Sequence, residues 1–337
     1  MTASLCSRSK SKGMRGFKSE RRWRSCMIAF LVLVHDNPRQ ALALVESLRS
    51  SHARTFIHVD AKSDITQFQE CAQAGAVLIE ERKSVHWGGF SQVRAALALM
   101  RHALRDEIPF THFALLSGSD YPIATVEAIA SYLAAQDREF IDAEPVLEGP
   151  DSLPWQRMLK YQMEGGWRGA GLRGRIIREV NAHILSRLPN RDVRAIAGPV
   201  AFFRGSAYWI LTREAVEAIF AFSRKHKSIV RLLSHSVCSD ETFFHTAVMA
   251  GPRASHVAGT STYAQWFPGS SGPTVVDDSL VDVVTAPGFH LASGGRRARP
   301  ALFVRKLNGD DSGIRNRLDH YRTTRVLPTE PLPGRHG

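Results

Sequence analysis

The chain has 337 residues, of which 44% are apolar, 23% charged and 9% aromatic, and this balance excludes disordered, fibrous and collagen-like proteins. The longest apolar run, residues 27–34, is far shorter than the roughly 20 residues that a membrane-spanning helix needs. The net charge of +12 is concentrated at the N-terminus: residues 1–26 hold eight Lys/Arg and one acid, which leaves +5 for the other 311 residues.

The four cysteines lie far apart and form no CxxC pair. Neither a zinc site nor a disulfide framework is therefore indicated, and this usage fits a reducing compartment.

Residues 1–26 combine basic charge with few apolar residues and no periodicity, so we expect a disordered extension there. The sequence leaves open whether this segment is a native tail or lies upstream of a true start at Met27. Such a tail can associate weakly with an anionic membrane surface or with nucleic acid. Because the rest of the chain has no concentrated basic face, we do not expect nucleic acid as a partner.

Predicted strands and helices alternate from residue 27 to residue 144, which is typical of an α/β protein with a parallel sheet. Ligands of such sheets bind beyond the carboxyl ends of the strands, where polar clusters such as residues 117–120 fall. No GxGxxG follows the first strand, and no P-loop or GxSxG motif is present. The strands are expected at 27–34, 55–60, 76–79, 112–116 and 139–142, and the helices after Pro38, near 65–74, and at 92–104 and 125–134.

The second half is predicted to be rich in loops over residues 145–200, with a helix at 175–188, a strand at 202–211 and a helix at 213–224. The glycine-rich stretch 165–174 suits a flexible loop, or alternatively a substrate loop. Ser239 is expected to cap a helix that starts near Thr242, and acids in such a first turn need no functional role. Beyond residue 310 we expect a polar, partly disordered tail, 311–337.

Eight segments, in order, resemble the core-2/I-branching glycosyltransferases, glycosyltransferase family 14, which includes the peptide O-xylosyltransferases. The resemblance implies a GT-A-like α/β fold with a catalytic domain over residues 27–310. Residues 27–144 would bind the nucleotide, and residues 145–310 would carry the acceptor-binding and catalytic part. The segments are MIAFLVLVHDNP, FIHVDAKSD, VHWGGFSQVRAAL, FALLSGSDYPI, FRGSAYWILTREAV, SDETFFHTAV, YAQW and LFVRKL.

The resemblance further implies a UDP-sugar donor, either UDP-N-acetylglucosamine or UDP-xylose, inversion at the anomeric carbon, and neither a metal ion nor another cofactor. An inverting displacement needs a base for the acceptor hydroxyl and positive charge at the departing diphosphate. The family's base matches Glu241 of the DETFF segment, and its basic phosphate ligands match Arg305 and Lys306. Matched to the uridine and donor pocket are Asp60, Trp87 and Asp120.

The chain departs from the family in three ways. Thr262 precedes Tyr263 where the family often has arginine, residues 288–300 form a longer and more basic insertion, and neither paired cysteines nor a membrane anchor is present. These features resemble a bacterial-type soluble member. We therefore expect a cytoplasmic enzyme, peripheral at the inner membrane face, that acts on a surface glycan, lipid-linked oligosaccharide or protein.

Three alternatives remain open at this stage. The chain can be a catalytically inactive protein of the same fold that binds a nucleotide sugar or a glycan. His58 and Asp60 share one face of a strand and can contribute to a metal site, although two ligands are too few for one. Residues 1–26 can bind nucleic acid.

Overall fold

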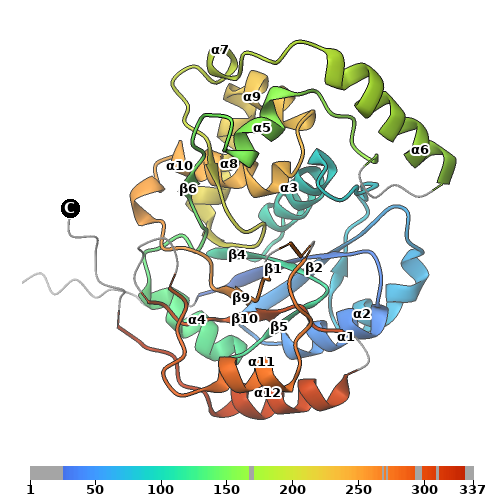
Figure 1. Ribbon diagram of the computed structural model, residues 1–337. Helices are drawn as coiled ribbons and strands as arrows, with labels where there is room; N and C mark the ends of the chain where they lie inside the picture. The colour runs from blue at the N-terminus through green and yellow to red at the C-terminus, as the bar shows by residue number, and fades with distance from the viewer. Residues whose placement is uncertain are drawn as a thin grey trace, which may run out of the picture.

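A five-stranded sheet forms the centre of the computed structural model (Figure 1). The structure describes residues 26–166, 171–267, 269–270, 272–292, 298–308 and 311–330, so the expectation for residues 1–25 lies outside the described part. The strand order is β3–β2–β1–β4–β8, with β1 to β4 parallel and β8 antiparallel, which confirms the predicted α/β class. The strands are β1 Ile28–Val34, β2 Ala53–Val59, β3 Val77–Leu78, β4 His112–Ser117 and β8 Ile210–Thr212.

The apolar run of β1 is explained by helices that cover both faces of the sheet. Phe30 and Val32 pack toward one face, beneath α1 (Pro38–Ser47) and α4 (Val126–Ala135). Ala29 and Leu31 point to the other face, beneath α3 (Phe90–Leu104) and α8 (Arg213–Lys225). A strand buried on both faces needs apolar side chains at every position, because successive residues alternate between the faces. The short 3₁₀ helix Ile65–Phe68 and α2 (Gln69–Gln73) follow β2.

A second, three-stranded sheet joins the two predicted parts of the chain. Its order is β5–β10–β9, with β10 antiparallel to β5 and parallel to β9. Since β8 also belongs to the central sheet, residues beyond 145 complete both sheets, and the described chain folds across the proposed division at 144/145. The strands are β5 Asp120–Pro122, β9 Thr262–Ala264 and β10 Phe303–Arg305, and a separate pair is β6 Glu144–Pro145 with β7 Phe203–Arg204.

The predicted strand at 139–142 is wrong. Glu139 and Phe140 make only isolated bridges, to Val257 and to Ile210. The fully buried Glu139 carboxylate instead accepts hydrogen bonds from the Thr212 backbone at 2.8 Å and from Arg253 Nε at 2.8 Å. A buried ion pair therefore holds this segment in place of a strand ladder.

The region of residues 145–200 contains more helix than the sequence predicted. The expected helix at 175–188 begins earlier, as α6 (Gly171–Glu179), and continues as a π-helical turn, Val180–Ile184, and a 3₁₀ turn, Leu185–Arg187. The expected strand at 202–211 is divided between β7 and β8. Two further helices are α5 (Leu153–Leu159) and α7 (Val193–Ala197).

The expectation of a polar tail after residue 310 is also wrong, because α12 (Ser312–Thr324) packs beside α11 (Asp278–Thr285) at the foot of the molecule (Figure 1). Ile314 and Leu318 are buried in a third cluster of apolar side chains. The Tyr121 hydroxyl donates to Asp319 Oδ1 at 3.0 Å, which ties α12 to β5. The C-terminal helix is thus part of the domain.

We expect Leu318→Ala to lower the free energy of unfolding by about 2–5 kcal/mol, because it leaves a cavity beneath α12. Urea denaturation followed by circular dichroism measures this loss, and Val326→Ala, at a strongly exposed position just past α12, is the control. A loss below about 0.5 kcal/mol for Leu318→Ala would show that α12 does not stabilise the domain.

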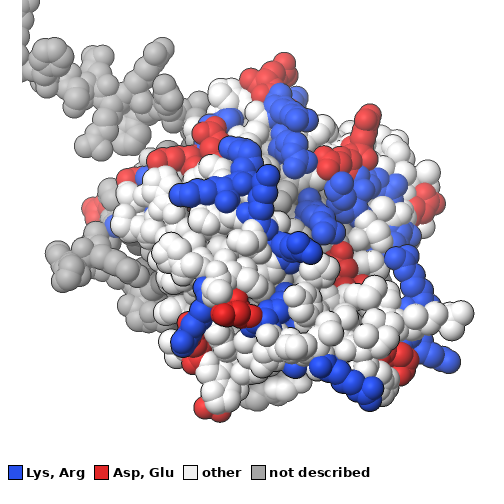
Figure 2. Space-filling view, turned by 90° about the horizontal axis from the view of Figure 1, so that it is seen from above, with Lys and Arg blue, Asp and Glu red and all other residues white. Residues whose placement is uncertain are grey.

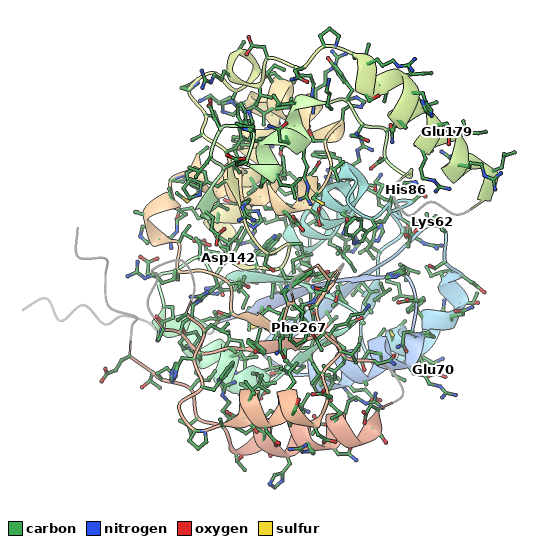
Figure 3. All side chains as sticks on the ribbon, viewed as in Figure 1. Lys62, Glu70, His86, Asp142, Glu179 and Phe267 are labelled. Atoms are coloured by element: carbon green, nitrogen blue, oxygen red, sulfur yellow. The ribbon has the colours of Figure 1, made fainter. Side chains whose placement is uncertain are left out.

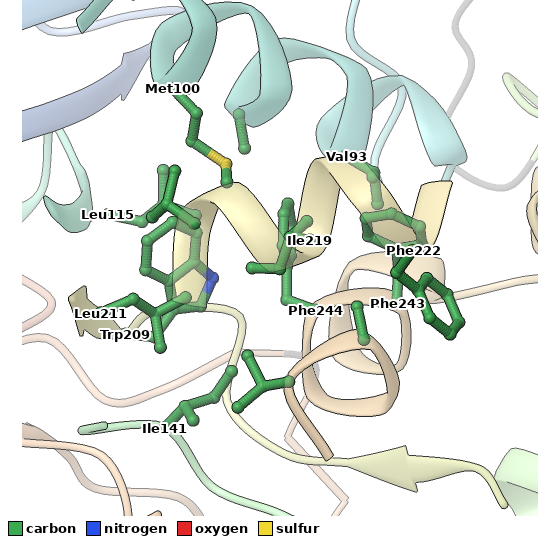
Figure 4. Close-up of a cluster of buried hydrophobic side chains, with 14 of the residues drawn as sticks. Val93, Met100, Leu115, Ile141, Trp209, Leu211, Ile219, Phe222, Phe243 and Phe244 are labelled. Carbon is green, nitrogen blue, oxygen red and sulfur yellow. The ribbon is translucent and has the colours of Figure 1, made fainter. Parts of the chain in front are cut away.

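The helices above the central sheet pack around large aromatic side chains, which Figure 4 shows in close-up. Trp209 lies against Phe244 with ring centroids 5.2 Å apart, and Phe243 meets Phe90 at 5.6 Å. Phe243 and Phe244 belong to α10 (Phe243–Met249), which packs against α8, and α9 (Lys227–Ser234) also packs against α8. The core therefore anchors the segment immediately before α10.

Within the described ranges, no helix is both long and apolar enough to cross a bilayer.

Candidate active site

Polar side chains gather beyond the carboxyl ends of the strands, as the fold class predicts. Asp60 directly follows β2, Ser117 ends β4, and Asp120 begins β5 a short turn later. Arg305 ends β10 in register with Asp120. The strand order thus brings residues from both halves of the chain to one edge.

Asp60 is held by the loop that follows β2. Its Oδ1 accepts the Lys62 backbone N–H at 2.8 Å, and its Oδ2 pairs with Lys62 Nζ at 2.7 Å. Arg82 donates to the Asp60 backbone oxygen at 2.7 Å, and Lys62 Nζ also reaches the Val85 carbonyl. In Figure 3, Lys62 lies on the same side of the molecule as His86, next to Trp87 in the chain. The structure therefore brings the predicted Asp60 and Trp87 segments together.

Arg305 is fixed between an aromatic ring and a buried carboxylate. Its guanidinium lies 3.9 Å from the centre of the Tyr208 ring, and its Nε is 3.5 Å from Asp120 Oδ1. Asp120 is fully buried and also accepts the Ser117 backbone N–H at 2.8 Å. Burial raises the pKa of Asp120, while the Arg305 charge opposes that rise. Asp120 was predicted to lie on the donor side, but a carboxyl with no exposed surface can act on a ligand only through Arg305.

Lys306 extends the basic site to the surface. Its side chain is exposed, whereas its backbone is fixed by hydrogen bonds to Thr274 and Val276. Arg305 offers a planar fork and Lys306 a point charge, the two geometries with which proteins bind phosphate.

Glu241 lies in a short 3₁₀ turn, Ser239–Glu241, that α10 holds in place. The buried Phe243 and Phe244 anchor the residues that follow, and the Gly205 N–H donates to the Glu241 carbonyl at 3.0 Å. A side chain at Gly205 would collide with Asp142, with only 2.3 Å between the two Cβ positions, so glycine permits this close approach.

The predicted N-cap at Ser239 is wrong. Its hydroxyl donates to the Ser236 carbonyl at 3.0 Å and also to the Leu233 carbonyl, so it ties the turn back to α9 and leaves the N-terminus of α10 uncapped by its side chain. The turn is thus a separate structure before α10, and its acids are not first-turn residues of that helix.

The Glu241 carboxylate is partly exposed, with 44% of its side-chain surface accessible, and it pairs with Arg157 at 3.4 Å. Burial of the carboxyl raises the pKa of Glu241, and the positive charges of Arg157 and Arg204 partly oppose this. The resulting group is a carboxylate that is more basic than a free glutamate and is open to an incoming molecule.

The charge of Arg157 offers a test of the expectation that Glu241 is the base. Replacing Arg157 by Gln removes a charge that favours the carboxylate, so the pKa of Glu241 rises further. A base must be deprotonated, so we expect the acid limb of the kcat/KM profile to move to higher pH in Arg157→Gln. Arg194→Gln, at an exposed position on the same side of the domain, is the control. An unchanged acid limb in Arg157→Gln would show that Glu241 is not the group whose titration controls activity.

Tyr208 links the basic site to the acidic turn. The pKa of its hydroxyl is raised mainly by burial, and the charges that act on it are those of Arg305, Asp120 and Asp240. Asp240, in turn, has its pKa raised to about 7 by burial and by the neighbouring Glu241. Within the described chain, Asp240 Oδ1 is buried without a hydrogen-bond partner. Arg305 and Tyr208 are thus in contact, and the charge of Asp240, next to Glu241, reaches Tyr208, so these four side chains belong to one electrostatic neighbourhood.

Trp87 lines a pocket of about 440 Å³, whose wall also includes Ser236 and Val237, shortly before the turn that holds Glu241. Its walls include Gly165 and Gly166, which begin the glycine-rich stretch, and Asn181 from the π-helical turn. A side chain at Gly166 would approach Ile177 to 2.9 Å, so glycine lets the loop lie against α6. Gly165 and Gly166 thus line a pocket, as the alternative of a substrate loop requires, whereas residues 171–174 are not loop but the start of α6, and residues 167–170 lie outside the described chain.

Sequence reasoning missed three members of the site. Asp240 was treated as a capping acid, Tyr208 as a strand residue, and Arg157 received no role. Asp240 carries a sequence signal, since it directly precedes Glu241 in SDETFF. Tyr208 lies within FRGSAYWILTREAV, one of the segments that resemble the family, although that segment does not show which side chain its ring contacts. Arg157 lies in none of the eight segments.

The proposed pair of metal ligands is engaged by the protein itself. His58 Nε2 accepts the Lys83 N–H at 2.8 Å, and burial lowers the pKa of His58 to about 4, so its ring is neutral. The Asp60 carboxylate binds Lys62. Across the ranges that the structure describes, no group of three His, Cys, Asp or Glu side chains is placed to share a metal ion.

The mostly parallel sheet, with its polar site beyond the strand ends, has the GT-A-like fold of nucleotide-sugar glycosyltransferases. The family model "Core-2/I-Branching enzyme" matches residues 28–283. The chain belongs to this family, as its eight segments indicated.

Curated relatives agree with this assignment. The chain is 28% identical over 310 residues to Xylosyltransferase 1 of Homo sapiens. The matched region covers 87% of this chain and 30% of that protein. It is 21% identical over 249 residues to the human beta-1,3-galactosyl-O-glycosyl-glycoprotein beta-1,6-N-acetylglucosaminyltransferase 3, covering 72% of this chain and 49% of that protein. The chain thus spans about a third to a half of the length of these relatives.

Proposed function

We propose that the protein is an inverting glycosyltransferase that moves a sugar from a UDP-sugar to an acceptor hydroxyl without a metal ion. One observation carries this proposal: Tyr208, whose ring stacks on Arg305, is also close enough to Asp240 for that charge to raise its pKa, and Asp240 directly precedes Glu241, whose own pKa is raised. A base and a phosphate ligand in one site are what a single displacement requires.

In the proposed reaction, Glu241 takes the proton of the acceptor hydroxyl as that oxygen attacks the anomeric carbon. The bond from this carbon to the β-phosphate oxygen breaks, and UDP departs with the bonding electrons. One in-line displacement inverts the configuration of the sugar. The raised pKa of Glu241 favours this role, because a base is most effective when its pKa approaches the working pH.

The charge that builds up on the diphosphate would be neutralised by Arg305 and Lys306. The face of the Arg305 guanidinium is covered by Tyr208 and its Nε is directed at Asp120, so its remaining N–H groups are the part that can bind phosphate oxygens. Donors held in this way need no reorganisation when the charge develops.

Asp60 and Trp87 are proposed to receive the uridine and the donor sugar. The names of the relatives, a xylosyltransferase and an N-acetylglucosaminyltransferase, support xylose or N-acetylglucosamine as the sugar. Trp266 and Phe267 follow β9, two and three residues past Ala264, which is in register with Arg305. Both rings are more than half exposed, and such rings suit stacking against a sugar, so we propose a glycan acceptor.

Release of UDP from a panel of UDP-sugars, in the presence of EDTA, tests the proposal. We expect turnover with UDP-xylose or UDP-N-acetylglucosamine, because water can replace the acceptor at a low rate. UDP release that appears only when a divalent metal is added would overturn metal independence. Binding of a UDP-sugar without turnover, with every glycan acceptor tried, would favour an inactive binding protein of the same fold.

A further inference from the structure

One surface of the molecule is apolar in a way that the site does not explain. It is a ridge along α6 and the two turns that follow it, residues 171–188, and we call it the α6 ridge. Leu172 and Ile176 lie one turn apart on the same side, whereas Gly174 and Ile177 face the domain. The exposed apolar side chains of the ridge are Leu172 at 71%, Ile176 at 53%, Ile184 at 58% and Leu188 at 38% exposure.

Arginines flank these apolar side chains. The ridge carries Arg173, Arg175, Arg178 and Arg187 against a single acid, Glu179, a net charge of +3 with histidine neutral. Arg178 lines the pocket beside Trp87, so Arg173 and Arg175 are the arginines next to Leu172 and Ile176. Glu179 is engaged by His183 at 3.0 Å, one turn along. Figure 1 shows α6 at the upper rim of the molecule, and Figure 3 marks Glu179 on it. Figure 2 looks down on this end, where Lys and Arg side chains are spread among uncharged ones, with Asp and Glu side chains between them.

We propose that the α6 ridge is a docking surface for an anionic lipid bilayer. An amphipathic helix with leucine and isoleucine on one side and arginines beside them lies in the plane of the membrane interface. Its apolar side chains enter the boundary of the acyl chains while its arginines meet anionic headgroups. The ridge supplies both components within 18 residues, and its inward side, at Gly174 and Ile177, is already packed on the domain.

The charge of the ridge argues against other occupants. A symmetric dimer would place the same surface on both sides of the interface, so the arginines of one copy would face those of the other. Nucleic acid would engage the arginines but would leave four large apolar side chains in contact with phosphates and water. A bilayer with anionic lipid satisfies both kinds of side chain.

Docking would also fix the position of the pocket beside Trp87. Arg178 and Asn181, on the inward side of the ridge, line that pocket, and Arg178 donates to the Gly166 carbonyl at 3.3 Å. The pocket would therefore open next to the bilayer surface. The inference does not depend on the proposed reaction, because it rests on the ridge alone.

Flotation of the full chain with lipid vesicles tests the inference. We expect binding to phosphatidylcholine vesicles that contain phosphatidylglycerol and weak binding to phosphatidylcholine alone. Leu172→Ser with Ile176→Ser should lower the partition coefficient about tenfold or more. Arg173→Gln with Arg175→Gln should lower it on anionic vesicles only. Matched controls are Val283→Ser with Val326→Ser, exposed valines of the α11–α12 end, and Arg49→Gln with Arg105→Gln, exposed arginines away from the ridge.

Three results would overturn the inference. The first is no binding to either type of vesicle by a chain whose circular dichroism and UDP binding are intact. Undiminished binding by the Leu172/Ile176 variant would assign the interaction to another segment, such as the basic residues 1–26. A dimer in analytical ultracentrifugation that this variant converts to a monomer would show that the ridge is covered by a second copy.

Discussion

Glu241→Gln is expected to lower kcat for sugar transfer by about 10²–10⁴-fold, because the amide cannot accept the proton of the acceptor hydroxyl. The Kd for UDP should change by no more than about twofold, since the diphosphate is assigned to Arg305 and Lys306. Steady-state release of UDP gives the first quantity and calorimetry the second.

The matched control is Glu217→Gln, an exposed acid on α8. It should retain full activity. Unchanged turnover in Glu241→Gln would refute the assignment of the base. A parallel loss of UDP binding would instead show that the carboxylate holds the turn together, because it also pairs with Arg157.

Arg305→Gln is expected to lower kcat/KM by about 10²–10³-fold and to weaken UDP binding, because it removes the fixed positive charge at the departing diphosphate. The substitution also leaves the buried Asp120 carboxylate without the positive charge of Arg305. The pKa of Asp120 therefore rises further and the domain loses stability. Arg305→Lys separates these effects, since it keeps the charge but lacks the planar fork that stacks on Tyr208.

We expect Arg305→Lys to fold normally by circular dichroism and to bind UDP more weakly than the native protein but more tightly than Arg305→Gln. Arg317→Gln, which removes a surface arginine paired with Asp278 and Asp282, is the control. Equal UDP affinity in the native protein, Arg305→Gln and Arg305→Lys would exclude Arg305 as a phosphate ligand.

The sheet could be predicted because its signals are local. An unbroken apolar run predicts the strand at residues 27–34, and apolar residues at helical spacing predict α3. The strand predicted at residues 139–142 is absent because an ion pair between Glu139 and Arg253 holds this segment, and the two residues are more than 100 positions apart in the chain. No local pattern reports such a contact.

The C-terminal helix, by contrast, had a local signal that the polar composition obscured. Asp311 caps the helix by accepting the Ile314 N–H at 2.9 Å. Ile314 and Leu318 follow with a spacing of four residues, and Tyr321 comes three later, so the three share one side of the helix. A short apolar stripe on a mostly charged helix is enough when α11 already presents an apolar surface to it.

The site was predicted from motifs, and the fold adds what motifs omit. Glu241, Arg305, Lys306, Asp60 and Trp87 all come from segments that resemble the family. Tyr208 also lies in such a segment, FRGSAYWILTREAV, but its role depends on the fold, which brings its ring against Arg305 across nearly 100 residues of chain. Arg157, which pairs with Glu241, lies outside all of these segments, so only the fold brings it to the site.

Basic side chains are proposed to replace a metal ion at the diphosphate. The affinity for UDP with and without a metal ion, measured by calorimetric titration, tests this directly. The titration is carried out on the native protein in EDTA and repeated with Mn²⁺. We expect the same Kd within about twofold under both conditions, and a weaker Kd for Arg305→Gln under both. Binding of UDP that is absent in EDTA and restored by Mn²⁺ would contradict it.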